Sequence, residues 1–162
     1  MSGSGFVLTR TYPAEVEEVW RLWTTRDGIE AWWGPGGYAV TVQAMDLRPG
    51  GELRYTMTAV APEQVAFARQ NGMPVATPAT LVYTEVDPPR RLAFRHLVDF
   101  VPDVAPYEVG HVVELEGVAG GTRLVLSCDA MHDEVWTSRA RQGWEAELWK
   151  LDALLAGTAA GA

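Results

Sequence analysis

Two histidines, His96 and His111, are the side chains of this sequence best suited to chemistry. Each alternates with apolar residues, in predicted strands over 92–99 and 107–116. Because residues two apart share one face of a strand, both imidazoles are expected to point into the core from neighbouring strands. Neutral imidazoles there could hydrogen-bond a ligand carbonyl or phenol, or act as general acid and base near neutral pH. The alternative is that a nearby backbone or hydroxyl group satisfies each ring.

The other reactive side chains match no metal or nucleophile motif. His132 is close in sequence to Asp129 and Asp133, but Asp133 directly precedes a predicted helix and is expected to cap it. Cys128 falls in a predicted core strand, where no helix N-terminus lowers its pKa, and is expected to be a buried, inert thiol. We therefore predict no metal, no cofactor and no covalent mechanism.

Two tryptophans are expected to touch a ligand, with core packing as the alternative for both. Trp33 precedes the Gly34-Pro35 turn, and Trp144 lies on the inner stripe of the last predicted helix. The other helical tryptophans are expected to pack or to anchor at the surface; they are Trp20, Trp23, Trp136 and Trp149. Charged residues that could stand at the rim of a site are Glu85, Asp99 and Arg139.

The elements that must position these residues follow from changes of hydrophobic period along the chain. A period of two predicts strands, and a period of 3.6 predicts helices. The first helix is expected to hold Pro13 in its first turn. The predicted strands are 6–11, 38–44, 51–59, 80–86, 92–99, 107–116 and 122–128, and the predicted helices are one from Pro13, 28–32, 62–73 and 134–155. Residues 62–77 are interpreted as an insertion that could act as a lid, bearing Val65 and Phe67, with Pro74 and Pro78 bracketing an irregular stretch.

This order predicts an α+β protein with a curved antiparallel sheet of about seven strands around a long C-terminal helix, and two short helices after the first strand. A single domain over 1–162 is expected, with 1–5 and 157–162 as flexible ends. A strongly twisted sheet and one helix about 10 Å wide leave space at the concave face unless large side chains fill it. A solid core is the alternative. The residues expected to line a ligand pocket are Trp33, Tyr55, Met57, Phe94, His96, Val109, His111, Trp144 and Leu148.

The composition excludes several partners. The net charge of −8 over 162 residues argues against nucleic-acid binding, which needs a cationic surface. No apolar run approaches the roughly 20 residues that span a bilayer, and the first residues lack the features of a signal peptide. A cytoplasmic location is expected, with the chain a monomer or a homodimer.

Several short motifs, taken together and in order, resemble a known family. They are Trp20, Glu30-Ala31-Trp32-Trp33-Gly34-Pro35, Leu47-Arg48-Pro49-Gly50-Gly51, Glu85-Val86-Asp87-Pro88-Pro89-Arg90-Arg91-Leu92 and Gly143-Trp144 with Leu148 and Leu151. Over nearly its whole length the chain resembles the homologues of the activator of the heat-shock protein 90 ATPase, within the START-like (SRPBCC) superfamily. The resemblance implies the helix-grip fold and, for many relatives, binding of a lipid, a polyketide or another apolar molecule.

Three functions remain open from the sequence. The leading hypothesis is noncatalytic binding of a small apolar or aromatic molecule in an internal cavity. The first alternative is an enzyme resembling the cyclases or aromatases of the superfamily, with His96 and His111 as acid and base. The second is a protein-interaction module related to chaperone activators.

Overall fold

In the described part of the chain, residues 5–34, 36–99 and 101–160, a computed structural model shows seven strands and four helices. In chain order they are β1 (Phe6–Tyr12), α1 (Val16–Thr24), α2 (Arg26–Trp32), β2 (Tyr38–Met45), β3 (Glu52–Ala59), α3 (Pro62–Gln70), β4 (Ala76–Asp87), β5 (Arg91–Val98), β6 (Tyr107–Val118), β7 (Gly121–Cys128) and α4 (Glu134–Ala160). The order and type of these elements confirm the predicted α+β class.

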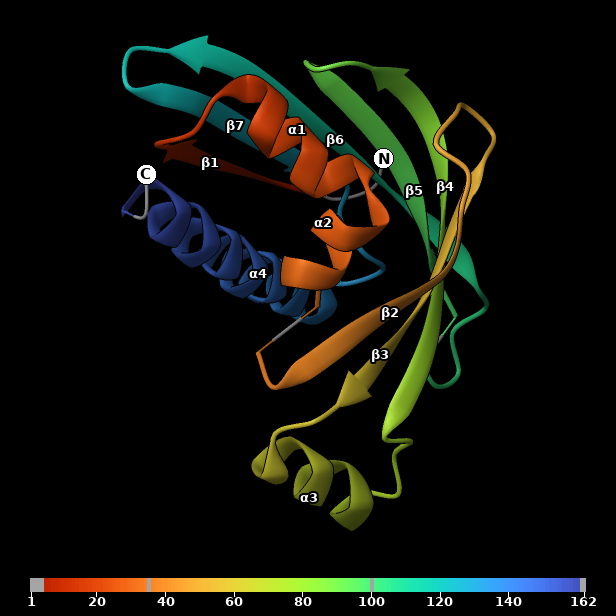
Figure 1. The fold of residues 1–162 in the computed structure, drawn as a ribbon. Coiled ribbons are helices and arrows are strands. Elements are labelled where there is room, and N and C mark those ends of the chain that lie inside the picture. Colours follow the sequence, from red (N-terminus) through yellow and green to blue (C-terminus); the bar gives the residue numbers. More distant parts are fainter. Residues whose placement is uncertain (1–4, 35, 100, 161–162) are drawn as a thin grey trace.

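All the strands belong to one antiparallel sheet with the order β1-β7-β6-β5-β4-β3-β2. The sheet curves, and the long helix α4 lies across its concave side together with α1 and α2 (Figure 1). This arrangement is the predicted helix-grip fold. None of the helices in the described residues combines the length and apolar character that crossing a membrane would need.

Some predicted boundaries need correction. Pro13 precedes α1 instead of occupying its first turn, and Glu15 is the N-cap. Pro78 lies inside β4, opposite Thr56, so the predicted irregular stretch is shorter than expected. The backbone of α4 continues as helix through Ala160, past the predicted helix end at residue 155. The predicted flexible residues 1–4 and 161–162, and Pro35 of the predicted turn, lie outside the described residues.

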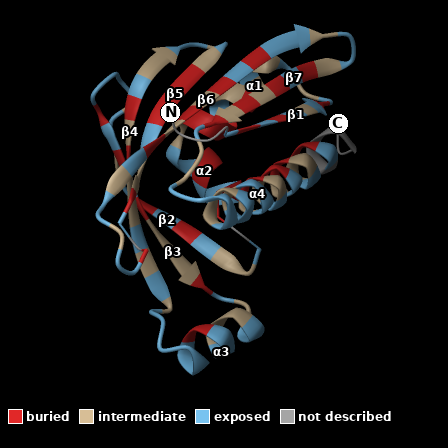
Figure 2. Ribbon diagram, turned by 180° about the vertical axis from the view of Figure 1, so that it is seen from behind, coloured by how far each residue is buried: buried red, intermediate tan, exposed pale blue. Residues whose placement is uncertain are grey.

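The core lies between the concave face of the sheet and the helices, as the burial colouring shows (Figure 2). Alternate residues of the central strands point into it, so the predicted inward sides of the strands are confirmed. The fully buried large side chains include Tyr12, Trp23, Trp32, Tyr55, Tyr83, Phe94, Leu124 and Leu126. Phe67, which sits on α3, is 55% exposed, and α3 packs against β3 at the end of the sheet.

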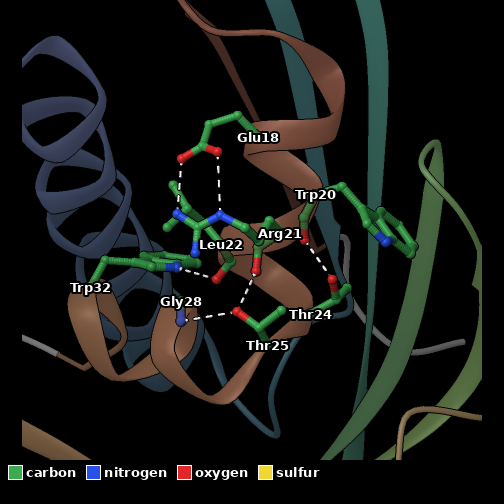
Figure 3. A network of polar contacts seen from close by, with 8 residues as sticks. All are labelled: Glu18, Trp20, Arg21, Leu22, Thr24, Thr25, Gly28 and Trp32. Atoms are coloured by element: carbon green, nitrogen blue, oxygen red, sulfur yellow. Dashed lines mark hydrogen bonds and ion pairs between the residues drawn. The ribbon is translucent and has the colours of Figure 1, made fainter. Parts of the chain in front are cut away.

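A set of local hydrogen bonds fixes the corner between α1 and α2 (Figure 3). The Thr25 hydroxyl donates to the Arg21 carbonyl at 2.8 Å and accepts from the Gly28 amide at 3.0 Å. A Cβ on Gly28 would lie 2.6 Å from that Arg21 carbonyl, so the close approach needs glycine. The Trp32 indole N–H donates to the Leu22 carbonyl at 2.8 Å. This corner holds the end of α2 in place and thereby positions the next residue, Trp33.

Candidate functional site

Two adjoining pockets lie between α4 and the concave face of the sheet. The first, which we call the Trp136 pocket, has a volume of about 240 Å³. Its lining consists of Phe6, His96, Val98, Val109, His111, Cys128, Asp129, Met131, Trp136, Arg139, Ala140 and Trp144. The second, the Glu147 pocket, has a volume of about 210 Å³. Its lining consists of Trp33, Tyr55, Met57, His96, Ala140, Gly143, Trp144 and Glu147. The two pockets share His96, Ala140 and Trp144, so these residues form the wall between them.

Small residues on α4 create this space. Ala140 and Gly143 face the sheet from the N-terminal half of the helix, where a larger side chain would occupy the pockets. A Cβ added to Gly143 would meet no atom within 4 Å. The volume therefore depends on particular residues as well as on the curvature of the sheet.

His96 and His111 both line the Trp136 pocket, and His96 also lines the Glu147 pocket. The register pairs His96 with Val109 and Phe94 with His111, which places the two histidines diagonally on the same face of β5 and β6. Their ring centroids are 6.2 Å apart. The His111 ring also stacks on Phe94 at 4.9 Å and lies 5.5 Å from Trp144. The predicted proximity of the two histidines is thus present in the structure.

Both imidazoles are neutral near pH 7. Burial lowers the pKa of His96 to about 4, although the charge of Asp99 opposes the shift. Burial, helped by the neighbouring His96, lowers the pKa of His111 to about 3 against the hydrogen bond to Val109. The Tyr55 hydroxyl and His96 Nε2 are hydrogen-bonded at 3.1 Å. The rings therefore act as neutral hydrogen-bonding groups and not as cations.

A carboxyl group, Glu147, faces the second pocket from α4. Its Oε1 accepts from the Gly34 amide at 2.8 Å, and Lys150 donates to the Gly34 carbonyl at 2.9 Å. Side chains of α4 thus bind both the backbone N–H and the carbonyl of Gly34, the residue directly after Trp33. Burial raises the pKa of Glu147 to about 7, against the opposing effects of the Gly34 N–H and the Lys150 charge. Near neutral pH this carboxyl group is therefore present in both protonation states.

Aromatic rings make up much of the pocket walls. Trp33 contacts Trp144 at a centroid distance of 5.4 Å and Tyr55 at 6.2 Å, both in edge-to-face geometry. Trp144 in turn stacks on Trp23 at 6.0 Å. Edge-to-face and stacked aromatic packing is favourable and holds the rings rigidly. These tryptophans therefore pack with the core and also line the pockets, so the two expectations for them are compatible.

Charged groups stand along one side of the Trp136 pocket. The Arg139 guanidinium lies 5.1 Å from the centre of the Trp136 ring, within cation–π distance. Asp129 Oδ2 accepts from the Gly110 amide at 3.1 Å. Both residues are exposed. An apolar interior with a polar edge is typical of small-molecule sites.

Comparisons with known proteins agree with this architecture. A family model described as "Activator of Hsp90 ATPase homolog 1-like protein" matches residues 13–156. The chain belongs to this family. A search of curated proteins found no match. The family membership confirms the resemblance read from the motifs.

Solved structures share the family fold over almost the whole chain. A crystal structure of a protein from Chromobacterium violaceum is 21% identical with a TM-score of 0.77, covering 94% of this chain and 98% of that one. The AHSA1 protein from Silicibacter pomeroyi is 22% identical with a TM-score of 0.72 and the same coverages, 94% and 98%. A solution structure from Staphylococcus epidermidis is 20% identical with a TM-score of 0.74, covering 98% and 93%. At these identities the likeness shows the fold.

Within this family fold, the structure brings together most of the residues singled out from the sequence. Those that line a pocket are Trp33, Tyr55, Met57, His96, Val109, His111 and Trp144. Phe94 lines neither pocket but stacks behind His111, and Leu148 is fully buried in packing. No residue of the predicted lid, 62–77, contributes to either lining.

Four lining residues of α4 were missed or misjudged. Trp136 was assigned to packing or to the surface, and Ala140, Gly143 and Glu147 were not singled out as site residues. A signal for Glu147 was present, since it follows Trp144 by three residues and so lies on the same side of the helix. An acidic residue that close to an inner stripe suggests a buried carboxyl.

The remaining reactive groups occupy structural positions. Asp133 caps α4 as predicted, since its Oδ1 accepts from the Trp136 amide at 2.8 Å. His132 Nδ1 and the Tyr107 hydroxyl are hydrogen-bonded at 2.6 Å. Burial raises the pKa of Cys128 above its ordinary value. Among the described residues, no three His, Cys, Asp or Glu side chains come close enough together to hold a metal ion.

Proposed function

We propose that this protein binds a small apolar or aromatic molecule, without catalysis, in the two pockets between α4 and the sheet. The observation that carries the proposal is the pair of adjoining hollows, about 240 and 210 Å³, with mainly aromatic and aliphatic walls. Each is below the range of roughly 300–1,000 Å³ usual for drug-sized ligands. The ligand is therefore a molecule of one or two rings, or one that moves the shared wall to span both pockets.

The state of the histidines supports binding over acid–base catalysis by these two residues. A general base works best when its pKa lies near the working pH. Burial holds the pKa of His96 at about 4 and that of His111 at about 3, so each is a weak base at pH 7. Neutral rings of this kind can still hold a ligand by stacking and hydrogen bonding.

A cavity-filling variant tests the proposal directly. Ala140→Phe places a ring at the wall shared by both pockets, whereas Ala146→Phe makes the same change on the exposed side of α4. Native mass spectrometry of the purified wild type would reveal a co-purified molecule. Tryptophan quenching with fatty acids, flavonoids and naphthalene then measures binding by all three proteins.

We expect saturable binding by the wild type and by Ala146→Phe, and a loss of at least about tenfold in affinity for Ala140→Phe, since the added ring displaces the ligand. A circular dichroism melt of each variant separates lost binding from lost folding. A bare native mass, with no saturable quenching by any compound, would overturn the proposal and favour a protein-interaction role.

The second candidate function is acid–base catalysis on a ligand in the Glu147 pocket. One observation favours it: Glu147 has a pKa of about 7 and lines the same pocket as the hydrogen-bonded Tyr55 and His96 pair. Turnover of a bound polyketide that disappears in Glu147→Gln, with affinity retained, would establish it. Unchanged ligand mass after long incubation with the wild type would exclude it for that ligand.

A further inference from the structure

The hydrogen-bonding state of His111 points to the chemical class of the ligand. His111 Nδ1 lies 3.1 Å from the Val109 carbonyl oxygen. A carbonyl oxygen can only accept, so Nδ1 carries the ring hydrogen and donates it. Because the buried ring is neutral, Nε2 has a free lone pair and is a hydrogen-bond acceptor.

The Nε2 acceptor is left for a ligand. His111 lines the Trp136 pocket, and Nε2 is at the end of the ring away from Cγ and from the Nδ1 contact with the strand. Within the described residues, no protein group is hydrogen-bonded to His111 Nε2. This atom is not one of the fully buried side-chain atoms that lack a partner in the described part of the chain, which are Trp23 Nε1 and the Tyr83 hydroxyl oxygen, so Nε2 is open to the pocket. A ligand that displaces water from it must supply a donor or leave the acceptor unpaired, which costs free energy.

Two of the other polar groups of this pocket, His96 Nε2 and Asp129 Oδ2, already have hydrogen-bond partners. His96 Nε2 is paired with the Tyr55 hydroxyl at 3.1 Å. Asp129 accepts from the Gly110 amide, and the Arg139 guanidinium lies over Trp136. Asp129 and Arg139 are also exposed, so water screens them, whereas His111 is buried.

We propose that the Trp136 pocket selects small aromatic molecules that carry a hydroxyl or amine hydrogen-bond donor, and that His111 Nε2 accepts this hydrogen. The inference rests on the proposed binding function and narrows its ligand class. A ketone or an ether of the same shape presents a lone pair to the lone pair of Nε2 and leaves both acceptors without a partner. The pocket therefore discriminates against ligands that only accept.

Three probes of similar shape test this selection: 2-naphthol, which donates; 2-methoxynaphthalene, which only accepts; and naphthalene, which does neither. Equilibrium dialysis at pH 7 gives the three dissociation constants. We expect 2-naphthol to bind the wild type about tenfold more tightly than 2-methoxynaphthalene, the effect of one buried hydrogen bond gained against one acceptor left unpaired.

The variant His111→Phe removes the ring nitrogens and keeps an aromatic ring against Phe94. It should bind 2-naphthol and 2-methoxynaphthalene within about twofold of each other, because the acceptor is gone. The matched control His132→Phe makes the same change at a histidine that lines neither pocket, and it should retain the wild-type preference. His111→Leu serves the same purpose if His111→Phe does not fold.

The outcomes separate the inference from the proposed function. Equal binding of all three probes by the wild type overturns the selection by donors but leaves the binding function standing. A preference for 2-naphthol that survives in His111→Phe overturns the role of His111. If none of the three probes binds while a larger apolar molecule does, the inference about this pocket is wrong. If nothing binds at all, the proposed function fails as well.

Discussion

The two halves of α4 meet the same sheet in different ways. In the C-terminal half, Leu148, Leu151 and Leu155 are no more than 1% exposed and belong to the main core cluster. In the N-terminal half, Ala140 and Gly143 occupy the corresponding inner positions and leave the two pockets open. The helix and the sheet are continuous through both halves. The difference teaches that the helix-grip fold permits a cavity, while the choice of side chains on one helix decides where it lies.

Truncating a buried side chain in the packed C-terminal half of α4 should cause the largest loss of stability. Leu151→Ala removes a fully buried side chain where neighbours cannot collapse freely, and should cost about 3 kcal/mol of unfolding free energy. Met57→Ala, in the wall of the Glu147 pocket, should cost under about 2 kcal/mol because space already adjoins that side chain. Urea unfolding measures both. Equal losses would mean that the two halves are packed alike.

The Glu147 carboxyl should give the cavity half a pH dependence that the packed half lacks. Its pKa is about 7 in the folded protein against an ordinary value of 4.5. The folded state therefore holds the proton more tightly, and the resulting stability is fully present below pH 4.5 and lost as the pH rises through 7. For this half-buried group we expect the loss to be about 2 kcal/mol.

The variant Glu147→Gln should remove this loss, so its stability should fall less than that of the wild type between pH 5 and pH 8, by about the same 2 kcal/mol. Urea unfolding at both pH values measures the difference. Glu17→Gln, which changes an exposed carboxyl on α1, is the control and should follow the wild type. A steeper fall in Glu147→Gln than in the wild type would contradict the sign of the shift.

The N-terminal cap of α4 should contribute to stability because the N-terminal half of this helix is less tightly packed against the sheet. Asp133 accepts from the Trp136 amide, so Asp133→Ala should cost about 1 kcal/mol. Asp133→Asn keeps an accepting oxygen and should cost less. Thermal melts of the two variants provide the measurement. A negligible effect of Asp133→Ala would show that contacts within the pocket walls already hold this end of the helix.

The smallest expected effect is a gain in stability. Gly143→Ala adds a Cβ into open space and improves helix propensity, so it should stabilise the protein by about 0.5–1 kcal/mol. The control is the helical glycine of α2: Gly28→Ala should destabilise, because its Cβ would lie 2.6 Å from the Arg21 carbonyl. Destabilisation by both changes would mean that the space beside Gly143 is not free.

Much of the site could be predicted because it lies on strands. The period-two alternation of β3, β5 and β6 is a local property, and it placed Tyr55, His96 and His111 on the inner face without knowledge of the register. The helical residues were harder. Ala140 and Leu148 are each four residues from Trp144 and so share its side of the helix, and nothing local distinguishes the residue that packs from the one that borders empty space.

What the sequence by itself determined was the order of the elements, their inner faces and the family, because hydrophobic period, turn residues and short motifs are all local. The tertiary structure decided the rest. The β5–β6 register and the path of α4 across the curved sheet brought Glu147, Trp136 and the two histidines to two adjoining pockets. Burial then moved the pKa of His111 to about 3 and that of Glu147 to about 7. Desolvation depends on every neighbour in space, and those neighbours are far apart in the chain.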